Sequence, residues 1–455
     1  MKLGSTLRAS FATACVLAIT ACGGGGGGDE SPAPTPPPPP PAPTDYQVGG
    51  TVSGLTADGL VLANAGAALA IDGGDTSFHL ANRLATGASY AVTIQSQPAG
   101  QTCALSHASG TVASADITNI AVSCRNYVAY VTNFNLATVE QFSLSPADGA
   151  MTAAGTAKAS GAKPRDVVVT PDGKYVFVAN SDNPSGNSIS RYSVDADGLL
   201  TAVLPPASTG DAPVDLAISN DGEFLYAANY DDNAVRQYGV GTDGSLDALS
   251  PASVATGTNA SSITLSPDGK HAYATNFNAS TVSQYGAGTG KLAPLATPTA
   301  GTGLGPRDMA FTPDGKFAYV TNQGNGTTAG TVSMYSVATN GQLTLLGIVN
   351  AGLQAWGIKV SPDGKAVFVA NMNNHSVSQY DIGTDGRLTP MATATVQTGS
   401  GPRGMAFTPD GKYLYVTNLS DSTITQFEVK STGLEALTTK PMSSLIAGPW
   451  AIAIH

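Results

Sequence analysis

The sequence is poor in the residues that build metal and redox centres. Its 455 residues include 4 cysteines and 5 histidines, and neither Cys-x-x-Cys nor His-x-x-x-His occurs. Structural zinc sites and c-type haem attachment sites are usually built on such spacings. We therefore expect no metal site and no cofactor.

Charged residues are also scarce, at 12% of the chain, and the formal net charge is −11. Nucleic-acid-binding proteins carry a basic patch that neutralises phosphates, and the sequence shows no such patch. We expect no nucleic-acid partner. An acidic surface mainly supports solubility, and we expect a monomer.

The N-terminus carries one short apolar run. Lys2 and Arg8 precede it, and residues 1–21 have the character of a secretory signal peptide that is too short to span a bilayer. The run ends in Ile19-Thr20-Ala21-Cys22, which resembles a bacterial lipobox. This resemblance implies cleavage before Cys22 and attachment of lipid to its sulfur. With Gly23 in place of aspartate, the expected location is the outer membrane of the cell envelope, reached through the lipid anchor.

Residues 22–44 contain too much glycine and proline to build a core. A proline tract prefers the polyproline II conformation and acts as a semi-rigid spacer. Residues 45–125 then show short alternating apolar segments bounded by Gly, Asn and Asp, which predict a small β-sandwich. The stretch from Tyr46 to Cys124 resembles the immunoglobulin-like modules of bacterial surface lipoproteins.

The cysteines divide into two groups. Cys15 lies in the predicted leader and Cys22 is the predicted lipidation site, which leaves Cys103 and Cys124. Free thiols are uncommon outside the cytoplasm, so these two are expected to form a disulfide.

A four-residue motif organises the remainder of the chain. It consists of an aromatic residue, two small residues and an asparagine, and it recurs at intervals of about 47 residues, a period typical of β-propeller blades. Its seven copies end at Asn133, Asn180, Asn229, Asn276, Asn322, Asn371 and Asn418. Each repeat carries four strand signals, with an Asp-Gly turn between the first and the second.

The two ends of this region complement each other. The first repeat begins without an opening strand, at Tyr127, and the chain ends in an opening strand over residues 448–455 with nothing after it. Joined, the two ends complete one blade and remove an open sheet edge. The predicted fold is therefore all-β: a seven-bladed β-propeller over residues 126–455, closed by its terminal strands and preceded by the sandwich.

The repeats, most of them preceded by Gly-Pro-Arg and Pro-Asp-Gly-Lys segments, resemble the YVTN β-propeller family. They are similar to its lactonase branch, the 6-phosphogluconolactonase-like proteins. The resemblance implies lactone hydrolysis, but the branch often has His after Gly-Pro-Arg and Glu after the motif asparagine. Here Asp166, Asp308 and Gly404 follow the arginines, and no Glu follows an asparagine. The obvious general base for hydrolysis is therefore missing, although Asp166, Asp215 and Asp308 are candidates for this role.

Aligning the repeats on Pro-Asp-Gly identifies one position, which we call the slot, at the start of each innermost strand. The slots hold Arg165, Val214, Ser261, Arg307, Trp356, Arg403 and Trp450. Around a closed ring, three arginines and two tryptophans alternate over five consecutive blades. Together with Asp166 and Asp308, they are candidates for binding a small anion, because guanidinium groups bind carboxylate or phosphate and flat rings stack.

Packing of arginine on tryptophan, with no ligand, explains the same alternation. The primary hypothesis is accordingly a membrane-anchored binding or scaffold lipoprotein for a small anionic ligand or a surface protein. The alternative is a lactonase-like hydrolase acting on a small anionic lactone at the channel mouth. The sequence leaves open whether the protein is an enzyme.

Overall fold

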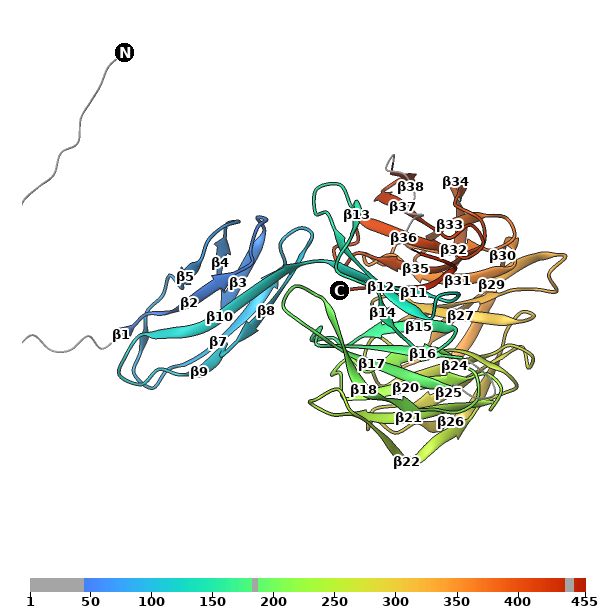
Figure 1. The fold of residues 1–455 in the computed structure, drawn as a ribbon, viewed down its shortest axis with the longest axis horizontal. Coiled ribbons are helices and arrows are strands. Elements are labelled where there is room, and N and C mark those ends of the chain that lie inside the picture. Colours follow the sequence, from blue (N-terminus) through green and yellow to red (C-terminus); the bar gives the residue numbers. More distant parts are fainter. Residues whose placement is uncertain (1–44, 182–186, 438–445) are drawn as a thin grey trace, which may run out of the picture. The chain divides into compact units, whose positions relative to one another are not determined.

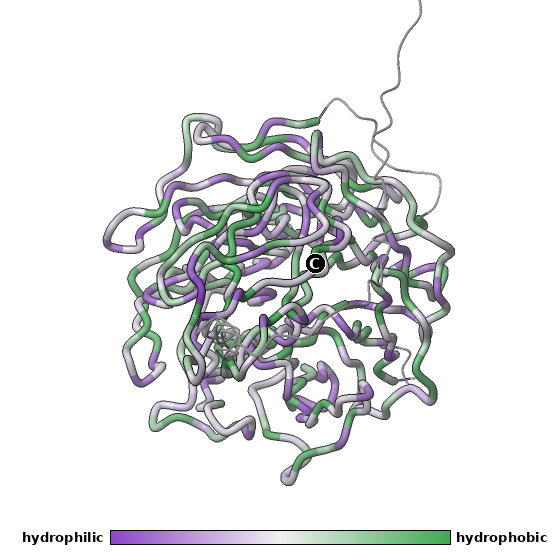
Figure 2. The backbone as a smooth tube through the Cα atoms, turned by 90° about the vertical axis from the view of Figure 1, so that its left-hand side faces the viewer, coloured by the Kyte–Doolittle hydropathy of each residue, from purple (hydrophilic) through white to green (hydrophobic). Residues whose placement is uncertain are grey.

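The computed structural model describes residues 45–181, 187–437 and 446–455, and every regular element in these ranges is a β-strand. The predicted signal peptide, the Cys22 lipidation site and the 22–44 linker lie outside the described residues. Within the described part of the chain, no helix is long and apolar enough to cross a membrane. Hydrophobic and hydrophilic residues are interspersed along the backbone (Figure 2), as expected for half-buried strands.

The first ten strands form a small sandwich with two four-stranded sheets, of order β5-β2-β10-β8 and β4-β3-β7-β9, and a short β1-β6 pair. The strands are β1 (Asp45–Tyr46), β2 (Val48–Ser53), β3 (Leu60–Asn64), β4 (Ala67–Ile71), β5 (Ser77–His79), β6 (Leu84–Ala85), β7 (Ser89–Ser96), β8 (Gln101–Ser106), β9 (Ser109–Thr111) and β10 (Ile117–Asn126). Both sheets contribute to one core, in which Leu62 from one sheet and Ile120 from the other are fully buried. The predicted sandwich is present, with more strands than the sequence pattern indicated.

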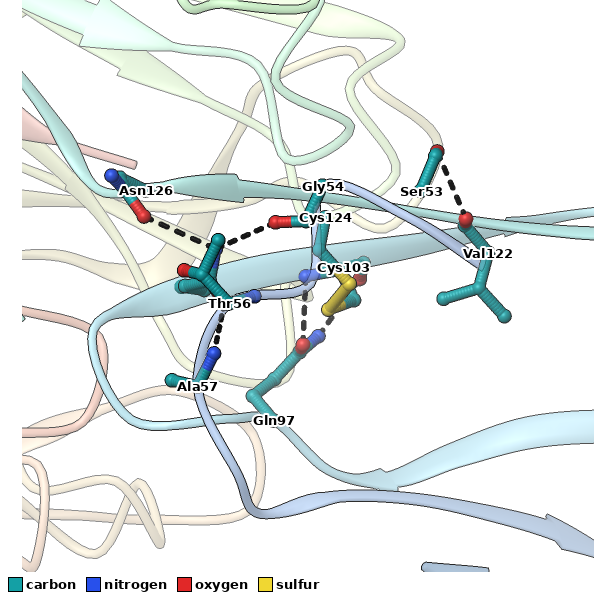
Figure 3. The surroundings of a disulfide bond; sticks show 10 residues. Ser53, Gly54, Thr56, Ala57, Gln97, Cys103, Val122, Cys124 and Asn126 are labelled. Atoms are coloured by element: carbon teal, nitrogen blue, oxygen red, sulfur yellow. Dashed lines mark hydrogen bonds between the residues drawn. A yellow bond between two sulfur atoms is a disulfide. The ribbon is translucent and has the colours of Figure 1, made fainter. Parts of the chain in front are cut away.

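The predicted disulfide between Cys103 and Cys124 is confirmed (Figure 3). The two cysteines face each other in the register of β8 and β10, with their Cα atoms 4.0 Å apart. The Gln97 side chain bonds to the backbone of the same cysteine. Its amide accepts a hydrogen bond from the Cys103 N–H at 2.8 Å and donates one to the Cys103 carbonyl at 2.9 Å. Closing a loop of this size stabilises a fold by about 3 kcal/mol on the chain-entropy model.

The remaining strands form the seven blades of the propeller (Figure 1). The innermost strands are β15 (Pro164–Val169), β19 (Pro213–Ile218), β23 (Ala260–Leu265), β27 (Pro306–Phe311), β31 (Ala355–Val360), β35 (Pro402–Phe407) and β39 (Pro449–Ile454). The second strands, which end in the motif asparagines, are β11 (Val128–Asn133), β16 (Tyr175–Asn180), β20 (Phe224–Asn229), β24 (His271–Asn276), β28 (Phe317–Asn322), β32 (Ala366–Asn371) and β36 (Tyr413–Asn418).

The third and fourth strands form the outer half of each blade. The third strands are β12 (Thr138–Leu144), β17 (Ser188–Val194), β21 (Ala234–Val240), β25 (Thr281–Gly286), β29 (Ala329–Val337), β33 (Ser376–Ile382) and β37 (Thr423–Lys430). The outermost strands are β13 (Met151–Ala153) with β14 (Lys158–Ala159) beside β12, then β18 (Leu200–Ser208), β22 (Leu246–Ala255), β26 (Ala293–Gly301), β30 (Leu343–Leu353), β34 (Leu388–Gln397) and β38 (Gly433–Ala436).

The Asp-Gly segments form the expected turns between first and second strands. In the turn after β15, the Asp172 carboxylate accepts hydrogen bonds from the Thr170 hydroxyl at 2.7 Å and from the Lys174 N–H at 3.1 Å. Gly173 adopts φ of 67°, which glycine reaches without steric cost. Each motif asparagine is buried, and six of the seven bond within their hairpins, as Asn276 does through its Nδ2 to the Thr281 and Ser283 hydroxyls at 3.0 and 2.9 Å. Asn229 instead accepts a hydrogen bond from the Thr209 hydroxyl at 3.1 Å.

The first blade is completed by the C-terminus, as predicted. Its order is β13-β12-β11-β39, and Ala129 and Val131 of β11 lie opposite Ile454 and Ile452 of β39. The chain therefore closes the ring with a strand pair that joins the two ends of the propeller sequence. This pairing leaves no innermost strand missing and no open edge at β11.

We predict that deleting residues 449–455 will open the ring and lower the melting temperature far more than the Ile452→Ala substitution. Ile452 is 7% exposed, so trimming it costs a few kcal/mol, about 2–5, while strand pairing is retained. The deletion removes the whole pairing partner of β11 and exposes its edge. Thermal unfolding followed by circular dichroism measures both variants, and a deletion variant that melts like the full chain would contradict the closure.

Candidate ligand-binding site at the channel mouth

The chain enters every innermost strand in the same way, and this geometry positions the slot residues. The residue before each strand has a positive φ, between 51° and 74°, whether or not it is glycine. Its carbonyl accepts a hydrogen bond from the residue that follows the motif asparagine, as Ala212 does from Tyr230 at 2.9 Å and Gly305 does from Gln323 at 2.8 Å. The slot residue and the residue after the asparagine are thus brought to the same mouth of the channel.

The three arginines and two tryptophans of the slots form one continuous stack. The Arg403 guanidinium lies 3.9 Å from the ring centroids of both Trp356 and Trp450. Arg307 lies 4.1 Å from Trp356 on one side, and Arg165 lies 4.6 Å from Trp450 on the other. Cation–π contacts of this kind hold charged groups against apolar rings at partly desolvated sites. The alternation found in the sequence is therefore a physical stack in the order Arg307, Trp356, Arg403, Trp450, Arg165.

Residues after the motif asparagines extend this stack, and the sequence analysis did not select them. Phe277 lies against Arg307 at 3.9 Å, and the Phe134 ring stacks on Trp450 with centroids 4.8 Å apart. The Gln323 side chain accepts a hydrogen bond from Arg307 Nε at 2.6 Å. The sequence did contain a signal for these residues, because the position after each motif asparagine repeats with the same period as the slots.

A cavity of about 530 Å³ opens beside the stack. It is lined by the five stacked residues, by the smaller slot residues Val214 and Ser261, and by Lys163, Ser181, Ala212, Tyr230 and Asp231. Aromatic and arginine side chains around a concave space of this size are typical of a small-molecule site.

Arg403 is the most informative residue in this cavity. Its side chain is almost fully buried, at 8% exposure, yet its Nε and Nη1 atoms have no hydrogen-bond partner among the described residues. Arg165 Nε is buried and unpartnered in the same way. A buried donor without a partner costs free energy, and the cost is greater for a charged group. Arg403 and Arg165 both line the cavity, so an anion bound there would lie beside these guanidinium groups.

The charges of the site are unbalanced toward the positive. Burial lowers the pKa of Arg403 to about 9, and the like charges of Arg307 and Arg165 lower it as well. Burial also lowers the pKa of Arg307 to about 10, while Tyr230 acts in the opposite direction. Among the described residues, the carboxylate that lines the cavity is Asp231, and it favours the charged form of Arg165. A negatively charged ligand would relieve the repulsion among the three guanidinium groups.

The other two predicted residues, Asp166 and Asp308, lie deeper in the channel. They line a narrower space of about 120 Å³ together with the arginines, Asp215 and Lys359, and they do not line the larger cavity. They accept hydrogen bonds from backbone amides rather than from arginines: Asp308 accepts from the Met309 N–H of its own strand at 2.8 Å, and both carboxylates accept from the next blade. Asp166 accepts from the Leu216 N–H at 2.9 Å, and Asp308 accepts from the Ile358 N–H at 3.1 Å. These carboxylates tie neighbouring innermost strands together below the mouth.

Burial raises the pKa of two channel carboxylates, Asp166 and Asp215. Burial raises the pKa of Asp166 to about 6, although the Leu216 and Val167 amides and the Lys359 ammonium lower it. Burial also raises the pKa of Asp215, and the neighbouring charges of Asp166 and Asp308 raise it further. This environment favours at least one protonated carboxyl group in the channel at mildly acidic pH.

Comparison with protein families decides the assignment. The profile of the family described as "Lactonase, 7-bladed beta-propeller" matches residues 91–185 and 127–444, which is more than half of the chain. The protein belongs to this lactonase family. A search of curated proteins found no match.

Solved structures share the fold. A putative 6-phosphogluconolactonase from Bacteroides fragilis is 23% identical, with a TM-score of 0.64, and the match covers 72% of this chain and 98% of that one. The periplasmic gluconolactonase of Pseudomonas aeruginosa is 23% identical, with a TM-score of 0.60 and coverage of 72% and 98%. Hydrazine synthase of Kuenenia stuttgartiensis also matches, with 21% identity, a TM-score of 0.54 and coverage of 67% and 92%. At these identities the likeness concerns the fold, which serves several functions.

We predict that Asp166→Asn will stabilise the protein more at pH 7 than at pH 4. A carboxyl whose pKa rises on folding, from 3.8 to about 6, contributes stability below its unfolded pKa, and this contribution is lost as the pH rises through 6. Asparagine keeps an acceptor for the Leu216 amide and does not ionise. Melting temperatures between pH 4 and 7 therefore give a variant-minus-wild-type difference that increases with pH.

Asp314→Asn is the matched control with the opposite sign. Hydrogen bonds from Thr312 and Lys316 lower the pKa of Asp314, so its stabilising contribution is present at neutral pH and is lost as the pH falls. The two variants should thus diverge in opposite directions from the wild type at pH 7. A pH-independent difference for Asp166→Asn would show that its burial does not perturb its titration.

Proposed function

We propose that the protein is a lactonase-like hydrolase that acts on a small anionic lactone at the Arg/Trp mouth of the channel. One observation supports this proposal above all: Arg403 is buried between two tryptophans with two N–H donors unpartnered. Arg403 also lines the cavity, together with Arg165 and Arg307. Family membership supports the hydrolase over the binding or scaffold function that the sequence alone favoured.

Three arginines can bind a ligand that is negatively charged and whose carbonyl oxygen gains negative charge during the reaction. A guanidinium group binds carboxylate or phosphate through two parallel hydrogen bonds, and the pair is stronger in a desolvated pocket. The tryptophan rings hold Arg403 in one plane, so little side-chain freedom is lost when an anion binds. In our proposal, the arginines both anchor the anionic group of the lactone and stabilise the oxyanion that forms at its carbonyl.

Hydrolysis then needs a group that accepts a proton from water. Asp231 is the carboxylate that lines the cavity, and we assign it the role of general base. The water oxygen attacks the lactone carbonyl carbon while Asp231 takes the proton. The ring C–O bond breaks as the tetrahedral oxyanion collapses, and the proton passes to the departing alkoxide. The product is the open hydroxy acid, and no other reactant is required.

We predict that the described domain, residues 45–455, hydrolyses at least one member of a panel of sugar-acid lactones. Arg403→Ala should lower kcat/KM about 100-fold, because it removes a donor to the oxyanion. Arg403→Lys should rescue little, since an ammonium group lacks the planar fork that stacks between the rings. Asp231→Asn should lower kcat with a smaller effect on KM. Ring opening is followed by acid release in a pH-stat.

Arg387→Ala is the control for these variants. Arg387 is an exposed surface arginine paired with Asp385 at 3.4 Å, and it does not line the cavity. Its removal should leave hydrolysis unchanged. Binding without hydrolysis by the wild type would support the scaffold function instead. Absence of both binding and hydrolysis would contradict the proposed site.

Anion binding has an internal reporter. The chain contains 2 tryptophans, and both contact Arg403. An anion that draws on the Arg403 N–H groups changes the electrostatic field at both rings, so intrinsic fluorescence should respond to inorganic phosphate or to gluconate. The response should saturate in the wild type and vanish in Arg403→Ala.

We also propose that the protein is anchored to the cell envelope through lipid on Cys22, with the 22–44 segment as a spacer and an immunoglobulin-like sandwich before the propeller. The lipobox resemblance supports this location. Cys22→Ala should move the protein from the membrane fraction to the soluble fraction, or leave it uncleaved. Unaltered fractionation and mass would contradict lipid attachment.

A further inference from the structure

Two neighbouring blades differ from the others at the slot. Five of the seven slots hold arginine or tryptophan, whereas β19 and β23 hold Val214 and Ser261 at the same position. The two small residues adjoin each other in the ring. The ring of large side chains is therefore interrupted on one side only.

The five large side chains occupy their own side of the mouth. Each arginine packs on at least one tryptophan, and Trp356 and Trp450 also contact each other edge to face, with centroids 6.2 Å apart. Arg403 at the centre of the stack is 8% exposed. All three arginines line the cavity, but the close contacts between guanidinium groups and rings leave no room for the body of a ligand between them.

The cavity extends over the interrupted side. Val214 and Ser261 line it together with Ala212 and Tyr230, and the arginines line the facing side of the same space. The three arginines thus supply charge, and the two small slots supply volume. An anionic group placed at Arg403 would leave the rest of its molecule over Val214 and Ser261.

The wall on this side offers shape rather than hydrogen bonds. Val214 is apolar and packs partly into the core between β19 and β23. The Ser261 hydroxyl is already engaged, at 2.7 Å from the Pro306 carbonyl and 2.9 Å from the Thr275 hydroxyl. Tyr230 presents an aromatic ring, and the apolar faces of sugar rings pack on such rings.

We propose that Val214 and Ser261 are specificity-determining residues: they form the gap that admits the ring-bearing body of an anionic sugar derivative and limit its size. The inference rests on the proposed function, because it assigns the part of the ligand that the arginines do not hold. A hydrophobic pocket discriminates by volume, typically by 10- to 200-fold for a small change in fit. A bulkier residue at slot 214 should exclude ring-bearing anions and spare small ones.

The test compares two probes on Val214→Phe, with tryptophan fluorescence as the readout. Inorganic phosphate needs only the arginines, so its Kd should stay within about 3-fold of the wild-type value, whereas glucose 6-phosphate, which carries a sugar ring, should bind about 10-fold or more weakly. For a lactone that the wild type hydrolyses, KM should rise with kcat little changed. Val214→Ala should keep glucose 6-phosphate binding, which separates steric exclusion from loss of a valine contact.

Ile348→Phe is the matched control, because Ile348 is 50% exposed on the outermost strand β30 and lies away from the cavity. It should bind both probes like the wild type. Equal weakening of both probes by Val214→Phe, or of neither, would overturn the inference while leaving the anion site standing. A wild type that responds to neither probe would overturn the proposed function as well.

Discussion

The propeller depends on hydrogen bonds that cross from one blade to the next. Motif tyrosines in five blades are buried, and their hydroxyls donate to glycine carbonyls in the following blade. The pairs are Tyr130 to Gly198, Tyr226 to Gly290, Tyr273 to Gly341, Tyr319 to Gly386 and Tyr415 to Gly149. A buried hydroxyl must be paired, so each tyrosine fixes the distance between blades. The last pair joins the seventh blade to the first and closes the ring together with the β11–β39 pairing.

The glycines in these pairs are required as much as the tyrosines. Gly386 has φ of 77°, and a Cβ placed on it would lie 2.1 Å from the Phe317 ring. The turn must therefore be glycine for the blades to approach. Glutamines of the third strands add a parallel set of ties, as Gln141 does by accepting from the Leu200 amide at 2.5 Å. Blade spacing is consequently set by specific polar contacts as well as by burial of apolar faces.

A rigid ring can hold like charges together at its mouth although their repulsion is unfavourable. Three guanidinium groups repel one another, and burial disfavours their charged forms. Stacking on Trp356, Trp450 and Phe277 offsets part of this cost. An anion bound beside the arginines would relieve the part of this unfavourable free energy that stacking does not offset. Repulsion among buried guanidinium groups, partly offset by stacking on aromatic rings, distinguishes the candidate site from ordinary surface arginines such as Arg387.

The sequence by itself determined the period, the blade count, the split first blade, the Cys103–Cys124 pair and the residues of the slots, because each depends on local spacing or on counting. Only the tertiary structure decided how the slots are used. It placed Asp166 and Asp308 on amides of neighbouring blades, drew Phe277 and Gln323 to Arg307, and opened a cavity beside Val214 and Ser261. These outcomes depend on distances across blade boundaries. Such distances are set by the packing of the whole ring, and no single repeat encodes them.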